Sequence, residues 1–156
     1  MRAKLQEYAL VAEIVGAVAV VVSLIYVGLG VRQNTDAIQV ANHQAIVAMD
    51  MEKNSWLRDS EFSATLLNAR QDIGSLSPAE LEQVSTFSAD TFNAWEFAFL
   101  TYNSGAVEEF IWRGWDGFYR SMLQEDPYRW FWKGSGENFS PDFNSYIESI
   151  IAVQNN

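Results

Sequence analysis

The chain has no cysteine and only one histidine, His43. The missing cysteine excludes disulfides, thiolate nucleophiles and cysteine-ligated metals, and it leaves the redox compartment open. A His-His metal pair cannot form within one chain, and a Ser-His triad would depend on His43 alone. We interpret His43 as a solvated or packed side chain; the alternative is a ring of His43 side chains that binds a metal in an oligomer. No cofactor and no metal site is predicted.

Basic residues are also few, since 10 Lys and Arg stand against 20 Asp and Glu and give a formal charge of −10. Arg2 and Lys4 balance Glu7 and Glu13, so the first 31 residues are neutral and the negative charge belongs to the rest of the chain. Nucleic-acid binding needs clustered Lys and Arg to displace counterions. Nucleic acid is therefore excluded as a partner, and docking of the acidic part on anionic lipid is disfavoured.

Catalytic and phosphate-binding motifs are missing as well. Glu108 and Glu109 are adjacent and point about 100° apart on a helix, so they do not form an acid/base pair. Gly114-Trp115-Asp116-Gly117 has neither the spacing nor the lysine of a phosphate loop. The sequence predicts no enzymatic activity.

The chain does contain one long run without a charge, Ile14 to Val31. Eighteen helical residues rise about 27 Å, and adding Tyr8 to Ala12 exceeds the roughly 30 Å hydrocarbon layer. We predict a single uncleaved membrane span. The alternatives are a cleaved signal peptide, whose apolar region is usually shorter, and a buried helix of a soluble protein.

Small residues recur along this span at alternating steps of three and four, a period of 3.5 that places them on one helical face. We call this face the seam; its residues are Ala9, Ala12, Gly16, Ala19, Ser23 and Gly30, together with Tyr26. Small side chains allow close backbone approach between membrane helices. We predict that the seam packs against another membrane helix, from a second copy or from a partner. The alternative is that Gly and Ala are simply common in spans.

The ends of the span carry the few charges that bear on its placement. Glu13, at the amino-terminal edge, is interpreted as solvated at the interface; the alternatives are a polar contact to a partner helix and an ion or proton pathway. Arg2, Lys4 and the terminal amine outnumber Arg32, which favours a cytoplasmic amino terminus. The acidic domain would then be periplasmic if the source is a Gram-negative bacterium, and the opposite orientation stays open.

Beyond the span, Arg32 to Arg58 contains no Pro or Gly, and we predict a nearly continuous helix from about Leu5 to Asn54. Asn34-Thr35-Asp36 is consistent with either the cap of a new helix or a polar collar where one helix leaves the lipid. A stripe of alanines indicates close contact in water; it consists of Ala37, Ala41, Ala45 and Ala48.

Shorter helices are expected over residues 61–72, from 78 to about 102, over 106–124, and after 126 and 141. Ser77-Pro78-Ala79-Glu80 is a capping box with proline at the first helical position, and Ser140-Pro141-Asp142 repeats the cap-then-proline signal. No stretch alternates like a half-buried strand. Among the side chains expected to point inward are Phe62, Leu66, Leu67, Phe110, Ile111, Trp115 and Phe118.

Eighteen of the 22 aromatic residues lie between Phe87 and Tyr146. Their helical spacing favours core packing, which supplies much buried area per residue. The alternatives are a hydrophobic ligand pocket, or Trp130-Phe131-Trp132-Lys133 lying at the lipid headgroups.

Together these patterns predict an all-α fold: a single N-terminal transmembrane helix that continues into a long helix, followed by a small aromatic-rich helical domain. The domains are residues 1–31, the tail and span, and residues 32–156, the acidic part, with 32–58 as the helical extension of the span.

The run from Ala12 to Gln39, with Arg32-Gln33-Asn34-Thr35 after the span, resembles the opening of a group of uncharacterised small bacterial proteins. In that group a helical region with aromatic patches follows, similar to Asp126–Trp132 and Phe139–Phe143 here. The resemblance implies a membrane-anchored helical protein and no particular chemistry.

The expected function is that of a membrane-anchored interaction protein: a scaffold, accessory subunit or assembly factor of a membrane complex, or a self-oligomer. Its expected partners are the lipid bilayer and other transmembrane helices. Two alternatives stay open, namely an oligomeric channel or transporter accessory, and a small hydrophobic-ligand binder or enzyme that uses the aromatic domain.

Overall fold

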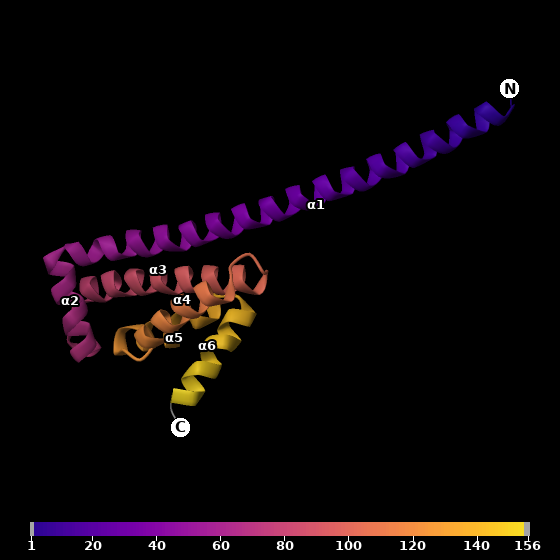
Figure 1. Cartoon of the computed structure of the whole chain (residues 1–156). Helices are drawn as coiled ribbons and strands as arrows, with labels where there is room; N and C mark the ends of the chain where they lie inside the picture. The colour runs from indigo at the N-terminus through magenta and orange to yellow at the C-terminus, as the bar shows by residue number, and fades with distance from the viewer. Residues whose placement is uncertain (1, 155–156) are drawn as a thin grey trace. The chain divides into compact units, whose positions relative to one another are not determined.

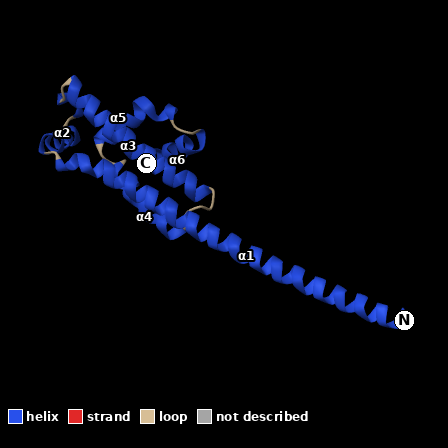
Figure 2. Cartoon of the chain, turned by 90° about the horizontal axis from the view of Figure 1, so that it is seen from above, coloured by secondary structure: helices blue, strands red, loops and turns tan. Residues whose placement is uncertain are grey.

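A computed structural model describes the backbone of residues 2–154 and the side chains of residues 6, 8 and 10–154. The chain divides into two compact units, Met1–Ile38 and Gln39–Asn156. Every regular element in the described part is helical, and no strand occurs there (Figure 2). The predicted all-α class is therefore confirmed, including the long helix at the amino terminus.

The first helix, α1, runs from Arg2 to Ser55 and confirms the predicted continuous helix (Figure 1). It passes through Asn34-Thr35-Asp36 without interruption, and Thr35 Oγ1 donates to the carbonyl oxygen of Val31 at 3.1 Å. Thr35 therefore bonds back into the same helix and does not cap a new one. The compact units separate after Ile38, whereas the predicted domain boundary at Val31 marks the end of the apolar run and stays a prediction about the membrane.

In the second unit, α1 is followed by the short helical turn η1 (Trp56–Arg58) and by α2 (Ser60–Gln71). Asp59 caps α2, because its Oδ1 accepts hydrogen bonds from the backbone N–H of Glu61 at 2.8 Å and of Phe62 at 3.1 Å. Phe62 and Leu66 are buried as predicted, but Leu67 is 55% exposed and its inward placement was wrong. A step of one residue turns a helix by about 100°, which carries Leu67 off the buried face.

A turn, η2 (Ile73–Ser75), leads to the central helix α3 (Pro78–Asn103). The predicted capping box is present: Ser77 Oγ accepts from the backbone N–H of Glu80, and Glu80 Oε2 accepts from that of Ser77 at 2.8 Å. The chain leaves α3 through Gly105, whose φ of +74° is the left-handed conformation that glycine tolerates best.

The remaining elements are α4 (Glu109–Met122), α5 (Asp126–Ser135), the turn η3 (Gly136–Asn138) and α6 (Pro141–Gln154). α6 begins at the predicted proline, but Ser140 does not cap it, because its Oγ has no hydrogen-bond partner. Instead, the backbone N–H of Ser140 donates to Glu96 Oε1 at 2.7 Å. The start of α6 is thus tied to α3 by a side chain remote in sequence.

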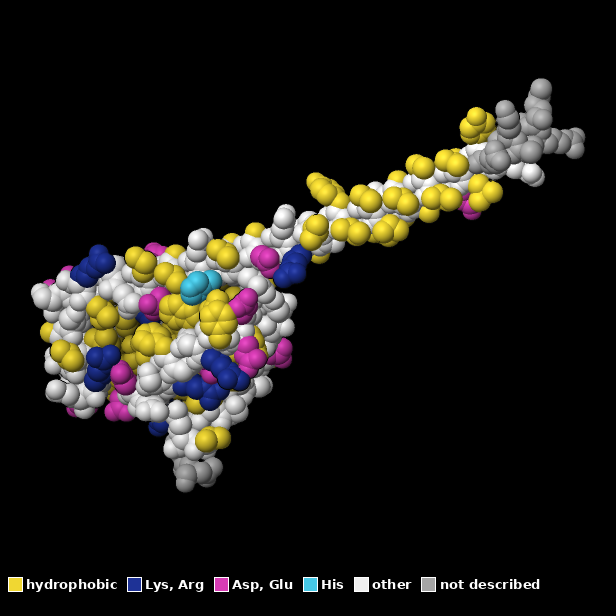
Figure 3. All heavy atoms as spheres, in the orientation of Figure 1, with side chains coloured by type: hydrophobic (Ala, Val, Ile, Leu, Met, Phe, Trp, Pro, Cys, Tyr) yellow, Lys and Arg dark blue, Asp and Glu magenta, His cyan; other side chains and the backbone are white. Residues whose placement is uncertain are grey.

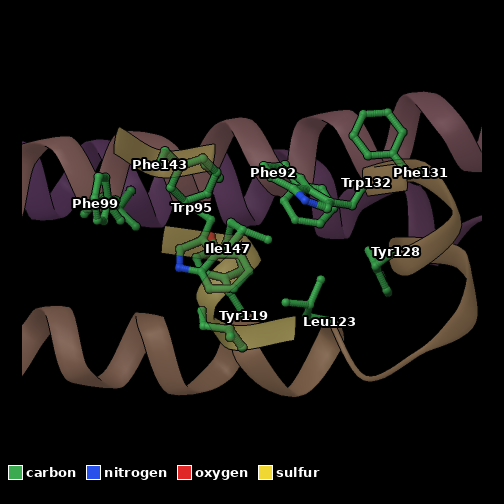
Figure 4. Close-up of a cluster of buried hydrophobic side chains, with 14 of the residues drawn as sticks. Phe92, Trp95, Phe99, Tyr119, Leu123, Tyr128, Phe131, Trp132, Phe143 and Ile147 are labelled. Atoms are coloured by element: carbon green, nitrogen blue, oxygen red, sulfur yellow. The ribbon is translucent and has the colours of Figure 1, made fainter. Parts of the chain in front are cut away.

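The core of the second unit is a cluster of aromatic rings around α3 (Figure 4). Trp95 stacks on Tyr119 of α4 with 5.6 Å between ring centroids, and Phe92 lies 4.9 Å from Trp132 of α5. Phe131 and Trp132 are 6% and 3% exposed, which contradicts placing them at the lipid headgroups. The core-packing interpretation is confirmed for these rings, and it fixes α4, α5 and α6 around α3.

Candidate functional site

An open hollow of about 690 Å³ lies in the second unit between α1 and α4. We call it the α1–α4 groove. Its α4 wall is apolar and consists of Phe110, Ile111, Gly114, Trp115 and Phe118. Its α1 wall contributes His43 and Asp50, which are the two polar side chains that line it. Figure 3 shows hydrophobic side chains gathered in this hollow beside the histidine.

The exposed apolar face of α4 corrects the prediction from sequence. Phe110 and Phe118 were expected to point inward, but they are 71% and 42% exposed. The buried residues of α4 are Trp112 and Tyr119, which lie about half a turn around the helix from Phe110. Both faces of α4 are aromatic, and only one of them faces the core. The other lines the groove.

Two features keep the groove open. The α1 wall is anchored to the domain by Ile46, which is fully buried, and by Asn42, whose Nδ2 donates to the carbonyl oxygen of Ala106 at 3.1 Å. On the opposite wall Gly114 has no side chain, and a Cβ placed there would meet nothing within 4 Å. The space between the walls is therefore left unfilled by the protein.

A buried ion pair links Asp50 of the groove to Lys53 behind it. Lys53 Nζ is 2.8 Å from Asp50 Oδ1, and the Lys53 residue is only 2% exposed. The same ammonium lies 5.2 Å from the ring centroid of Phe118 and 5.4 Å from that of Tyr119. Asp50 Oδ2 also accepts from Asn54 Nδ2 at 2.7 Å. The Asp50 carboxylate is thus neutralised from within α1. Sequence analysis did not single out this pair, although its spacing of three residues on a helix is a recognisable signal.

Two buried polar atoms near the groove, Nδ1 of His43 and the hydroxyl of Tyr119, have no hydrogen-bond partner among the described residues. Tyr119 is 1% exposed, lies on the core-facing side of α4 and does not line the groove. Burial, and then the nearby Asp50 carboxylate, raises the pKa of Tyr119 well above its usual value, so the phenol stays protonated. Of these two residues only His43 lines the groove, and no hydrogen bond to its imidazole occurs among the described residues.

A smaller hollow of about 190 Å³ lies between α1 and α3. It is lined by Met49, Glu52, Lys53, Asp90, Asn93 and Ala94. Burial, and then the charge of Glu52, raises the pKa of Asp90. No group of three or more His, Asp or Glu side chains placed to hold a metal ion occurs among the described residues.

The seam lies in the first unit. Between Leu10 and Val31 no described side chain is buried within the chain, and α1 is long and apolar enough to cross a membrane by length and composition. The seam residues Ala12, Gly16, Ala19, Ser23 and Gly30 are all exposed; the side chain of Ala9 lies outside the described ones. A Cβ on Gly16 or Gly30 would meet nothing within 4 Å, so each leaves room for a neighbouring backbone.

The two polar residues Ser23 and Glu13 of the apolar helix differ in their hydrogen bonding. Ser23 Oγ donates to the carbonyl oxygen of Ala19 at 2.8 Å, so its proton is engaged inside the helix. Glu13 is exposed, and the polar contact suggested for it stays a prediction.

No protein-family model, curated protein or solved structure was found to match the chain. The resemblance to small bacterial membrane-anchored proteins therefore stays a prediction. Function has to be argued from the geometry described above.

Proposed function

We propose that this chain is a single-pass, membrane-anchored interaction protein. Its span packs through the seam against another membrane helix, either from a second copy or from a larger membrane complex in which it serves as scaffold, accessory subunit or assembly factor. The observation that carries the proposal is the complete exposure of the apolar segment Leu10–Val31. A stretch this apolar and this long needs a lipid environment or a covering partner, because water does not solvate it favourably.

The glycines of the segment support a helix-helix contact on one particular face. In lipid the hydrophobic effect does not bring helices together, so close van der Waals packing is the main attraction. Gly16 and Gly30 lie on the seam, whereas Gly28 lies on the opposite side of the helix. This arrangement supplies a matched pair of glycines for a test.

The hydrogen bond from Ser23 back into its own helix favours packing over conduction. A hydroxyl that is satisfied internally suits a lipid-facing or tightly packed surface, and it contributes little to a polar pore. We further propose the inner membrane of a bacterium as the location, with the amino terminus in the cytoplasm and the acidic domain in the periplasm, in line with the positive-inside bias of Arg2 and Lys4.

The test compares Gly16→Leu with Gly28→Leu, and Ala19→Leu with Ala17→Leu, in the full-length protein. Each pair makes the same chemical change on and off the seam. Association is measured by mass in mild detergent and by counting subunits in lipid vesicles. We expect the seam variants to weaken association about tenfold or more, which corresponds to about 1.4 kcal/mol, while the off-seam variants stay at the wild-type value.

Equal association of Gly16→Leu and Gly28→Leu would remove the seam from the proposal. A strict monomer without companions, both in detergent and in vesicles, would contradict the interaction function itself.

A further inference from the structure

We infer that the α1–α4 groove is a binding site for a small, uncharged amphiphile, meaning a molecule with an apolar body and one hydroxyl or carbonyl group. The site belongs to the second unit and does not depend on the seam. Four properties of the groove support this assignment: its size, its apolar wall, its charge balance and a histidine that makes no hydrogen bond.

Size and lining fit a small molecule. Ligand pockets generally measure about 300 to 1,000 Å³ and are lined mainly by apolar and aromatic side chains. The groove measures about 690 Å³, and its α4 wall presents three aromatic rings, those of Phe110, Trp115 and Phe118. Phe110 is 71% exposed, and a ligand lying along α4 would remove this ring from water.

The charges of the groove disfavour a charged head group. An anionic head would find the Lys53 ammonium already paired with Asp50, and the acidic domain around it carries the whole formal charge of −10. A cationic head would compete with Lys53 for the Asp50 carboxylate. The Lys53 ammonium already lies 2.8 Å from Asp50 Oδ1 and packs against the Phe118 ring. Displacing a buried ammonium leaves a desolvated charge without its partner, which is costly. An uncharged polar group avoids both penalties.

The histidine of the α1 wall calls for one hydrogen-bonding group on the ligand. His43 lines the groove, and no hydrogen bond to its imidazole occurs among the described residues. Its Nδ1 is closed off from solvent, so Nε2 is the nitrogen left for a ligand, and neutral imidazole either donates or accepts there according to its tautomer. A hydroxyl or carbonyl group on the ligand satisfies this nitrogen.

The same imidazole nitrogen disfavours a protein helix as the occupant. An amphipathic helix docks through an apolar face, and covering His43 with such a face would seal an unpaired nitrogen away from water. A second copy of the chain would in addition bring a second domain of charge −10 to the same surface. A small molecule meets neither obstacle.

The experiment uses the full-length protein in nanodiscs of dioleoylphosphatidylcholine, with a dodecanol that carries a photoreactive diazirine in its chain. Adducts are mapped by mass spectrometry. The variants are Gly114→Leu, which places a side chain in the empty centre of the groove, and the matched control Gly117→Leu on the same helix. A Cβ at either glycine meets nothing within 4 Å, so both variants should fold.

We expect adducts on α4 and on the His43–Asp50 segment, reduced about tenfold or more by Gly114→Leu and unchanged by Gly117→Leu. Dodecanoate and dodecylammonium versions of the probe should label this site much less. Circular dichroism and thermal melting of both variants check that they are folded.

Four outcomes would overturn the inference. They are equal labelling of the two variants, adducts confined to the apolar segment of α1, equal labelling by the charged probes, and crosslinks from the groove to a second copy of the chain. The last of these would identify the groove as an interface between copies.

Discussion

Lys53 Nζ lies 2.8 Å from Asp50 Oδ1, one helical turn earlier in α1, and the lysine is almost completely buried. A buried ammonium is tolerated only when a partner offsets its desolvation. Here Asp50 and the ring faces of Phe118 and Tyr119 supply that compensation. The pair joins the α1 wall of the groove to the α4 wall.

Substituting Asp50→Asn should therefore destabilise the second unit by about 3 to 5 kcal/mol, because it leaves Lys53 buried without its counter-ion. Lys53→Met should lower the free energy of unfolding by less, since methionine fills the space of the apolar part of the lysine side chain. The Asp50 side chain is 17% exposed and therefore keeps some contact with water. The double variant should be more stable than Asp50→Asn alone. Denaturant unfolding of the three proteins gives the comparison, and wild-type stability of Asp50→Asn would show that the pair contributes little.

Asp116 joins three elements and should be the most sensitive carboxylate of the domain. Its Oδ1 accepts from Trp95 Nε1 at 3.2 Å and from the Tyr146 hydroxyl, and its Oδ2 accepts from Arg120 Nε at 2.7 Å. Hydrogen bonds to charged groups are individually strong, and Trp95 lies at the centre of the aromatic core. Asp116→Ala should lower the free energy of unfolding by about 2 to 3 kcal/mol.

The control for Asp116 is Glu109→Ala on the same helix. Glu109 pairs with Arg113, but both side chains are more than half exposed, at 60% and 76%. Such pairs contribute about 0 to 1 kcal/mol. If the two variants unfold at the same denaturant concentration, the Asp116 network does not stabilise the core.

Two glycines should respond in opposite directions to the same change. Gly105→Ala forces a Cβ into the left-handed conformation at the end of α3 and should destabilise by about 1 to 2 kcal/mol. Gly117→Ala, inside α4 with free space around it, should stabilise by about 0.5 to 1 kcal/mol through helix propensity. Thermal melting measures both, and a shift of the same sign in the two variants would contradict the backbone argument.

Acid should weaken the start of α3. The hydroxyl of Ser77, and then its backbone N–H, hold the pKa of Glu80 below its ordinary value of 4.5. Because the folded pKa is the lower one, the stabilisation is complete above about pH 4.5 and is lost as pH falls through the folded value. Ser77→Ala should bring the pKa of Glu80 back up toward 4.5, which carbon-detected NMR titration of the carboxyl measures. An unchanged titration would show that the hydrogen bonds do not hold this carboxylate.

Helix starts were predictable from sequence when the capping partners lie within one turn. Ser77 and Glu80 form the capping box that their spacing predicts, and α6 begins at Pro141 as expected. The chemistry at Ser140 was not predictable, because the acceptor that engages its backbone is Glu96 from another helix. Sequence spacing specifies local partners and says nothing about a side chain 44 residues away.

The groove was predictable only in part. Sequence patterns pointed to an aromatic domain in which a ligand pocket was one alternative, and they placed Phe110 and Phe118 on an inward stripe. Helical periodicity marks an apolar face but does not say whether protein, ligand or water covers it. Here Trp112 and Tyr119 take the core-facing side of α4, and Phe110 and Phe118 line the groove instead. The prediction holds in part for Ile111 and Trp115, which line the groove and are also packed against the core.

The sequence by itself determined the helical class, the unbroken α1, the cap of α3 and the charge-free segment Ile14–Val31, because each depends on residues close together in the chain. Only the tertiary structure decided which aromatic face is buried, that Lys53 and Asp50 form a buried pair beside Tyr119, and that α1 and α4 leave a groove between them. These depend on how far apart two packed helices lie. The buried Ile46 holds α1 on the domain, and a glycine at position 114 leaves its side of α4 unfilled.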